Sequence, residues 1–335
     1  MVGAGAFGRN HLRVLRELQQ AGQAVELVGV IDRDSAAVAA ASEKFGVPGF
    51  ETIEACLAAV GGLDAASVCV PTVHHASAAA PLLTAGVDVL IEKPLAASLA
   101  DADLILDLAR QHGRVVQVGH LERFNPAVTA AQQHLHKPMF FEAHRLSIFT
   151  PRSLDVDVVL DLMIHDLDIV LSLVASPVRE VRAVGLPVLS NKVDIANVRV
   201  EFENGCVANF TASRVSTERV RKLRFFQPHQ YLSLDFARQD LLMIDVTAAA
   251  GMDPAQLAAL AQLAQQAGQH PSAGLSLKKV PVELGEPLLL EIASFLHAVR
   301  TRTAPLVSGE AGRAALALAL EINDAIAIHA KRAGL

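Results

Sequence analysis

The chain has 335 residues, of which 52% are hydrophobic and 19% are charged, so it can bury a large core and is long enough for about two domains. Its net charge of -6 gives no general attraction for nucleic acid or anionic lipid. No apolar run reaches the roughly 18 residues that a transmembrane helix needs. The three cysteines are far apart and lack metal-ligand spacing. These features predict a cytoplasmic protein without a targeting signal and without nucleic-acid or membrane partners.

Residues 1–118 alternate short runs rich in valine and isoleucine with alanine-rich helical stretches. This alternation is typical of repeated βαβ units, so we expect a parallel sheet of the Rossmann type. The clearest expected helices span 10–21 and 35–45, and the expected strands span 25–31, 66–70, 87–91 and 115–118.

After residue 118 the pattern changes, because extended segments follow one another with only turns between them. Strands are expected over 138–146, 178–185, 194–203 and 206–213, and Asn204-Gly205 is a strong hairpin signal between the last two. A helix is expected within 247–276, and closing helices over 286–300 and 309–331. The fold class is therefore α/β, with a Rossmann domain over 1–118 and, over 119–335, an α/β domain with an open, largely antiparallel sheet.

The segment 3–8, GAGAFG, fits the dinucleotide-binding fingerprint, in which glycines let a pyrophosphate approach the start of a helix. An acidic residue about 20 positions after the loop usually binds the adenosine ribose, and Asp32 follows Gly8 by 24 positions. A strand should precede the loop, but only Met1 and Val2 do so. We therefore expect a truncated first strand, with several further apolar residues upstream in the native protein.

Asp32 favours NAD, because a carboxylate bonds a free 2'-hydroxyl and repels a 2'-phosphate. The adjacent Arg33 offsets part of that repulsion, so NADP stays possible as the cofactor. Alternatively, Asp32 is a turn acid in the stretch before the next helix, where Asp34 or Ser35 is the better candidate for the cap.

Glu92-Lys93-Pro94 follows the expected strand over 87–91 directly, and Pro94 stops that strand because it lacks a backbone donor. A lysine at this position emerges where a parallel sheet binds ligands. Lys93 is therefore a candidate for chemistry, with a surface lysine at a strand end as the alternative.

The ordered motifs of the chain resemble the glucose-fructose oxidoreductase and inositol dehydrogenase family (Gfo/Idh/MocA). They are the glycine loop at 3–8, the Pro71-Thr72 turn with His75, Glu92-Lys93-Pro94, the segment 123–126 (RFNP) and the segment 161–165 (DLMIH). The resemblance implies NAD(P)-dependent hydride transfer at a carbohydrate-like carbon. It also implies a homodimer or homotetramer formed through the C-terminal sheet.

The resemblance further implies that Thr72 and His75 contact the cofactor, with Pro71 forming the turn, although a purely structural role for His75 stays open. Together with the fingerprint, the expected cofactor-binding residues are Gly3, Gly5, Phe7, Gly8, Asp32, Arg33, Pro71, Thr72, His75, Glu92, Lys93 and Arg123.

Asp161 and His165 are four residues apart in a helical stretch, so they share one face. Metal ligation is disfavoured because a third ligand of suitable spacing is not evident. The other alternative is a helix whose polar residues are satisfied internally, which suits Asp166 and Asp168 better than His165. The resemblance places Lys93, Asp161 and His165 in the catalytic centre, with His165 as the base, and adds Asn125 to the substrate site.

The segments 123–126 and 163–166 and the basic residues over 214–224 look most like the nucleotide-sugar branch of the family. Members of that branch oxidise UDP-N-acetylglucosamine at carbon 3 on the way to a lipid A precursor, and arginines suit a diphosphate. Alternatively, the basic run is a solvated strand edge. A free sugar or inositol is the alternative substrate, and a non-catalytic dinucleotide sensor or a scaffold protein is the alternative function.

Overall fold

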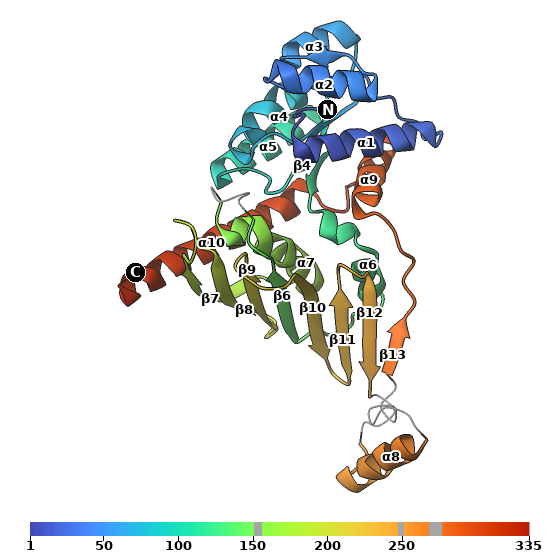
Figure 1. Cartoon of the computed structure of the whole chain (residues 1–335), viewed down its shortest axis with the longest axis vertical. Helices are drawn as coiled ribbons and strands as arrows, with labels where there is room; N and C mark the ends of the chain where they lie inside the picture. The colour runs from blue at the N-terminus through green and yellow to red at the C-terminus, as the bar shows by residue number, and fades with distance from the viewer. Residues whose placement is uncertain (151–155, 247–250, 268–276, 335) are drawn as a thin grey trace. The chain divides into compact units, whose positions relative to one another are not determined.

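A computed structural model describes residues 1–150, 156–246, 251–267 and 277–334 (Figure 1). The chain forms two compact units. Unit one contains Met1–Phe124 and Gly285–Leu318, and unit two contains Asn125–Leu284 and Ala319–Leu335. Helix α10 (Gly309–Ala333) begins in unit one and ends in unit two.

The sheet of unit one is parallel, as predicted. Its strands are β1 (Val30–Ile31), β2 (Gly49–Phe50), β3 (Ala65–Val68), β4 (Asp88–Glu92) and β5 (Val116–Gly119). Val2 forms parallel bridges with Ile31 on one side and Val68 on the other. The order β2-β1-Val2-β3-β4-β5 is that of a Rossmann sheet whose central position is held by Val2.

The strand predicted over 25–31 forms only at Val30–Ile31, so the prediction is wrong for its first five residues. A strand needs a neighbour to pair with. Residues 25–29 instead border a cavity of about 700 Å³. The amino group of Met1 also borders it and donates a hydrogen bond to the Gly29 carbonyl oxygen at 3.0 Å. Burial lowers the pKa of this amino group.

Helices surround this sheet. They are α1 (Ala6–Gln20), α2 (Ser35–Phe45), α3 (Ile53–Val60), α4 (His75–Thr84) and α5 (Leu99–His112). Three of them, α2, α3 and α5, begin at a residue whose side chain accepts a hydrogen bond from a backbone amide. The predicted helix over 35–45 is confirmed. It begins at the Asp34 cap, whose carboxylate accepts hydrogen bonds from two backbone amides, and it ends at Gly46 in the left-handed conformation.

Helix α9 (Pro287–Thr301) belongs to unit one, although the sequence analysis assigned all of 119–335 to the second domain. The reason is apolar packing. Ile292 and Phe295 of α9 cluster with Val14 and Leu18 of α1 and with Leu90 of β4. The chain therefore returns to the first unit to complete its core.

Unit two contains an eight-stranded open sheet, drawn in green to orange in Figure 1. Its order is β13-β12-β11-β10-β6-β9-β8-β7, and only β6 and β9 pair in parallel among its described strands. The bounds are β6 (Phe140–Leu146), β7 (Val178–Leu186), β8 (Ile195–Phe202), β9 (Val207–Ser213), β10 (Val220–Gln227), β11 (Gln230–Asp235), β12 (Asp240–Asp245) and β13 (Leu277–Val280). The antiparallel prediction and the β8–β9 hairpin at Asn204-Gly205 are confirmed.

One face of this sheet is buried beneath α6 (Pro126–Gln132), the π-helical turn η3 (Val159–Met163) and α7 (Ile164–Val174). Its core contains Phe141, Phe202, Phe210 and Phe225. A further helix, α8 (Pro254–Gln266), confirms the helix expected within 247–276, while 247–250 and 268–276 lie outside the described residues. In the part of the chain that the structure describes, every helix is too short or too polar to cross a membrane.

Candidate active site

The glycine loop of unit one is shaped by close backbone approaches. A Cβ atom at Gly3 would lie 2.7 Å from the carbonyl carbon and oxygen of Cys69, and one at Gly8 would collide with the carbonyl oxygen of Gly3. Gly5 precedes α1 and faces open space, since an added Cβ atom there would meet no described atom within 4 Å. The first turn of α1 carries no acidic residue. Its amides therefore suit a phosphate group.

Asp32 connects this loop to the end of β1. One carboxylate oxygen accepts a hydrogen bond from the Ala4 amide at 2.6 Å, and the other accepts one from the Asp34 amide at 3.0 Å. Helix α2 is capped by Asp34 rather than by Asp32. The half-buried Asp32 carboxylate thus fixes the position of the loop and remains at the edge of a cleft.

That cleft has a volume of about 480 Å³, which lies in the range of small-molecule sites. Several predicted cofactor residues line it, namely Gly3, Gly5, Asp32, Arg33 and Pro71. The open glycine loop and the carboxylate together fit a dinucleotide. The other predicted cofactor residues are outside this lining; they are Phe7, Gly8, Thr72, His75, Glu92, Lys93 and Arg123.

His75 is the first residue of α4 and is 1% exposed. Its Nδ1 atom lies 2.9 Å from the carbonyl oxygen of Pro94, and its Nε2 atom lies 2.9 Å from that of Val70. Burial lowers the pKa of His75, and the two carbonyl oxygens partly offset this effect. Both ring nitrogens therefore face the backbone, so this residue ties the end of β3 to the segment after β4.

Glu92 ends β4, and the half-buried Lys93 follows it, joined to Pro94 by a cis peptide bond. The Glu92 carboxylate lies 3.0 Å from the Nε2 atom of His11 and accepts a hydrogen bond from the Lys93 amide at 3.3 Å. His11 is fully buried, and its Nδ1 atom lies 2.8 Å from the Ser67 hydroxyl oxygen. The sequence analysis missed His11 and Ser67, although a histidine on the buried face of α1 was a signal.

Cys69 lies beside this cluster, and its sulfur is within 4.8 Å of candidate ligand atoms on His11 and Glu92. Burial, and then the charge of Glu92, raise the pKa of Cys69 well above its usual value, which keeps the thiol protonated. His11 and Glu92 also hydrogen-bond to each other directly. These observations describe a hydrogen-bonded network better than a metal centre.

Arg123 and Asn125 are buried and both bond the backbone. Arg123 donates to the carbonyl oxygen of Leu306 at 3.3 Å within unit one. Asn125 caps α6 by accepting from the Ala127 amide at 3.1 Å, and it donates to the carbonyl oxygen of Phe236 at 3.0 Å. Their expected roles toward cofactor and substrate remain predictions.

Asp161 and His165 belong to unit two, whereas Lys93 belongs to unit one. Asp161 lies half-buried in the π-helical turn, a feature that is frequent at functional sites. His165 follows in the first turn of α7 and is 9% exposed. For Asp166 the contacts support the alternative of internal satisfaction, because it accepts two hydrogen bonds from Arg145, at 2.9 and 2.8 Å.

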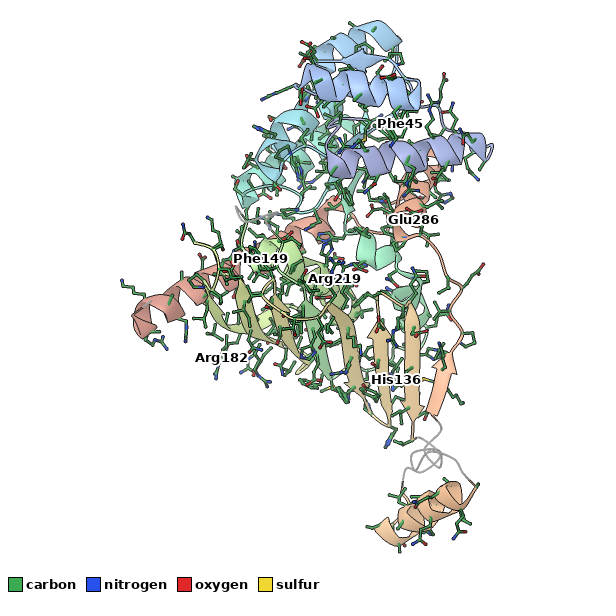
Figure 2. All side chains as sticks on the ribbon, in the orientation of Figure 1. Phe45, His136, Phe149, Arg182, Arg219 and Glu286 are labelled. Atoms are coloured by element: carbon green, nitrogen blue, oxygen red, sulfur yellow. The ribbon has the colours of Figure 1, made fainter. Side chains whose placement is uncertain are left out.

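The basic residues over 214–224 do not form one patch. Arg214 is buried and donates to the carbonyl oxygen of Val156. Side chains alternate along β10, so Arg221 shares the face of α7 with its cross-strand neighbour Arg145, while Lys222 and Arg224 point to the opposite face. Arg224 lies 3.6 Å from Glu142 there. Arg219 precedes the strand and is exposed (Figure 2).

Comparison with known proteins identifies the family of the chain. Residues 1–120 match the oxidoreductase family with an NAD-binding Rossmann fold, and residues 127–227 match the GFO/IDH/MocA C-terminal domain. The UDP-N-acetylglucosamine 3-dehydrogenase of Acidithiobacillus ferrooxidans is 33% identical over 99% of this chain and 98% of that protein. The chain belongs to the Gfo/Idh/MocA family. The resemblance seen in the sequence motifs is thereby confirmed.

A solved structure and a second relative are also similar to this chain. A solved structure of the Acidithiobacillus ferrooxidans enzyme has a TM-score of 0.84 at 32% identity, covering 97% of this chain and 96% of that one. The scyllo-inositol 2-dehydrogenase (NAD(+)) of Bacillus subtilis is 27% identical over 46% of this chain and 50% of that protein. The chain is therefore an NAD-binding oxidoreductase of this family.

Proposed function

We propose that the protein is an NAD-dependent dehydrogenase that acts on a nucleotide sugar and oxidises carbon 3 of UDP-N-acetylglucosamine, a step toward an amino-sugar lipid A precursor. The observation that carries this proposal is the 33% identity to a dehydrogenase of that specificity along nearly the whole chain. In unit two, Arg221 adds support, because a guanidinium on the α7 face suits a diphosphate.

The proposed catalytic residues come from both units. A bound NAD would supply the hydride acceptor for the carbon that carries the hydroxyl group. His165 takes the hydroxyl proton as general base, since histidine is the side chain that most often transfers protons in catalysis. The Lys93 ammonium stabilises negative charge on the substrate oxygen, and Asp161 orients a sugar hydroxyl.

The proposed cofactor site follows the cleft of unit one. The glycine loop receives the pyrophosphate, and Asp32 bonds the adenosine ribose. Asp32 favours NAD over NADP, and the exposed Arg33 makes that preference partial.

Turnover with a substrate panel tests the function. The full chain is incubated with NAD and, in turn, with UDP-N-acetylglucosamine, other UDP-sugars, free sugars and inositols, while reduced nicotinamide is followed by absorbance. A ketone trap such as hydroxylamine is included, because oxidation of an alcohol by NAD can be uphill. Turnover with UDP-N-acetylglucosamine is expected. Turnover only with free sugars or inositols would replace the substrate, and dinucleotide binding without any turnover would favour a sensor.

A free polyol is the second candidate substrate, because one relative is a scyllo-inositol dehydrogenase.

We also propose a homodimer or homotetramer formed through the sheet of unit two. Its face opposite α7 carries a half-buried cluster of Phe140, Phe226 and Tyr231. Light scattering after gel filtration checks the mass, and Phe226→Glu is expected to shift it to that of the monomer.

A further inference from the structure

A continuous chain of polar contacts runs through the buried part of unit one. It starts at the Ser67 hydroxyl on β3, passes through both ring nitrogens of His11 on α1, and reaches the Glu92 carboxylate at the end of β4. The second Glu92 oxygen accepts a hydrogen bond from the backbone amide of Lys93. The chain therefore ends at the residue that carries the proposed catalytic ammonium group.

The partners assign the protonation of His11. An ionised carboxylate accepts hydrogen bonds and cannot donate them, so the Nε2–H group of His11 donates the hydrogen bond that Glu92 accepts. The Nδ1 atom then accepts a hydrogen bond from the Ser67 hydroxyl. A neutral ring satisfies both contacts, and Ser67 selects the tautomer that Glu92 requires.

Packing confines the Glu92 carboxylate to this position. A Cβ atom at Gly119 of β5 would lie 2.7 Å from its Oε1 atom, so only glycine leaves room for the carboxylate beside β5. The Phe7 ring lies 5.3 Å from the His11 ring, measured between centroids, and covers it at the start of α1. The His11 ring is 0% exposed, and the Glu92 side chain is 12% exposed. The carboxylate thus depends on protein donors more than on water.

We propose that His11 is a positioning residue for the reaction, acting through Glu92, with Ser67 setting its tautomer. It holds the Glu92 carboxylate in one orientation, and Glu92 in turn fixes the backbone from which the Lys93 side chain extends. The inference rests on the proposed function, because it assigns Lys93 a role in turnover. Without the imidazole donor, the nearly buried carboxylate loses a hydrogen bond and changes its orientation.

Three variants separate this role from simple packing. His11→Gln keeps an amide donor near the position of Nε2, whereas His11→Leu fills similar space without a donor. Ser67→Ala keeps the imidazole but removes the group that selects its tautomer. The matched control is His112→Gln, on an exposed site at the end of α5.

We expect His11→Leu to lower kcat by about 10- to 100-fold, as is usual for the loss of a supporting hydrogen bond around a reactive group. The KM for the sugar substrate changes less than kcat, and the kcat against pH profile differs from that of wild type. His11→Gln recovers most of kcat and the wild-type profile, Ser67→Ala is intermediate, and His112→Gln matches wild type. A purely structural role would lower the melting temperature of both His11 variants and leave the pH profile unmoved.

A second measurement is independent of turnover. The nitrogen chemical shifts of His11 in ¹⁵N-labelled protein, assigned with the His11→Gln variant, are expected to show the neutral Nε2–H tautomer in wild type and a mixture in Ser67→Ala. An Nδ1–H tautomer in wild type, or wild-type kcat and pH profile in His11→Leu, would overturn the proposal. If wild type shows no turnover with any substrate, the proposed function fails by itself, and the tautomer measurement still decides whether the network exists.

Discussion

Each unit contains a buried polar cluster, and the two clusters are built differently. In unit one, the His11 imidazole bridges the Glu92 carboxylate and the Ser67 hydroxyl. In unit two, Arg145 and Asp166 form a two-bond ion pair whose side chains are each 4% exposed. Breaking the ion pair leaves a buried charge without its counterion, whereas breaking the histidine bridge removes a hydrogen-bond donor from the Glu92 carboxylate. We therefore expect loss of the ion-pair partner to lower stability, and loss of the histidine bridge to disturb the orientation of the segment that carries Lys93.

The largest expected effect tests whether both units supply chemistry. We expect Lys93→Ala and His165→Ala each to lower kcat by about 100- to 10,000-fold, the range for loss of an acid-base or charge-stabilising group. NAD affinity, measured by calorimetry, is expected to stay close to wild type. Near-normal kcat in both variants would eliminate the proposed catalytic residues.

The ion pair of unit two is expected to have the next largest effect. Arg145→Ala leaves Asp166 buried without its guanidinium partner, so the free energy of unfolding should fall by about 3–5 kcal/mol. Urea unfolding measures the loss. The control is Arg182→Ala, which removes the exposed Arg182–Glu180 pair on β7 (Figure 2) and should leave the urea midpoint unchanged. Equal urea midpoints for Arg145→Ala and Arg182→Ala would show that the buried ion pair contributes no more to stability than the exposed pair.

Arg221 and Arg224 lie on opposite faces of β10, so variants of these two residues form a matched pair for testing substrate recognition. Arg221→Gln removes a cation from the α7 face and is expected to raise the KM for UDP-N-acetylglucosamine by about 10-fold or more, as for a lost charged hydrogen bond. Arg224→Gln removes a cation from the opposite face and should leave KM unchanged. Steady-state kinetics at fixed ionic strength compares them, and a similar KM for both variants would remove Arg221 from the substrate site.

Filling the cavity beside residues 25–29 is expected to stabilise unit one. An extension of five alternating valine and isoleucine residues ahead of Met1 is expected to raise the free energy of unfolding by about 1–3 kcal/mol. The cavity wall includes Val25, Leu27 and Leu90, which such an extension would cover. A glycine-serine extension of equal length is the control. Identical urea midpoints for the two extended proteins would show that the cavity does not accept a strand.

The smallest effect concerns pH. Burial lowers the pKa of His75 from its usual 6.5, so the unfolded chain binds a proton at this site that the folded chain binds less readily. The free energy of unfolding should therefore increase as pH rises toward 6.5 and gain nothing further from His75 above it. Urea midpoints between pH 5 and 8 measure this slope. His75→Gln should flatten it, and an unchanged slope in that variant would assign the dependence to other groups.

Local signals in the sequence predicted much of this molecule. The Asp34 cap and Gly46 bound α2, Asn204-Gly205 forms the β8–β9 hairpin, and the glycine loop begins α1. These features depend on backbone preferences within a few residues, so sequence reading locates them. The change from parallel to antiparallel pairing follows from the same kind of signal, because it depends on the length and periodicity of each connection.

Contacts between distant residues were beyond such signals. His11 and Glu92 are 81 residues apart, and α9 packs on α1 although the segment Asn125–Leu284 of unit two lies between them in the sequence. The strand register was required to show that Arg221 and Lys222 lie on opposite faces of β10. The π-helical turn at Asp161 depends on the packing around it and has no local signal in the sequence. By itself the sequence determined the family and the fold class, because each has a local pattern, and it proposed the reactive residues. Only the tertiary structure decided which polar groups meet, because such meetings depend on how separate elements pack against one another.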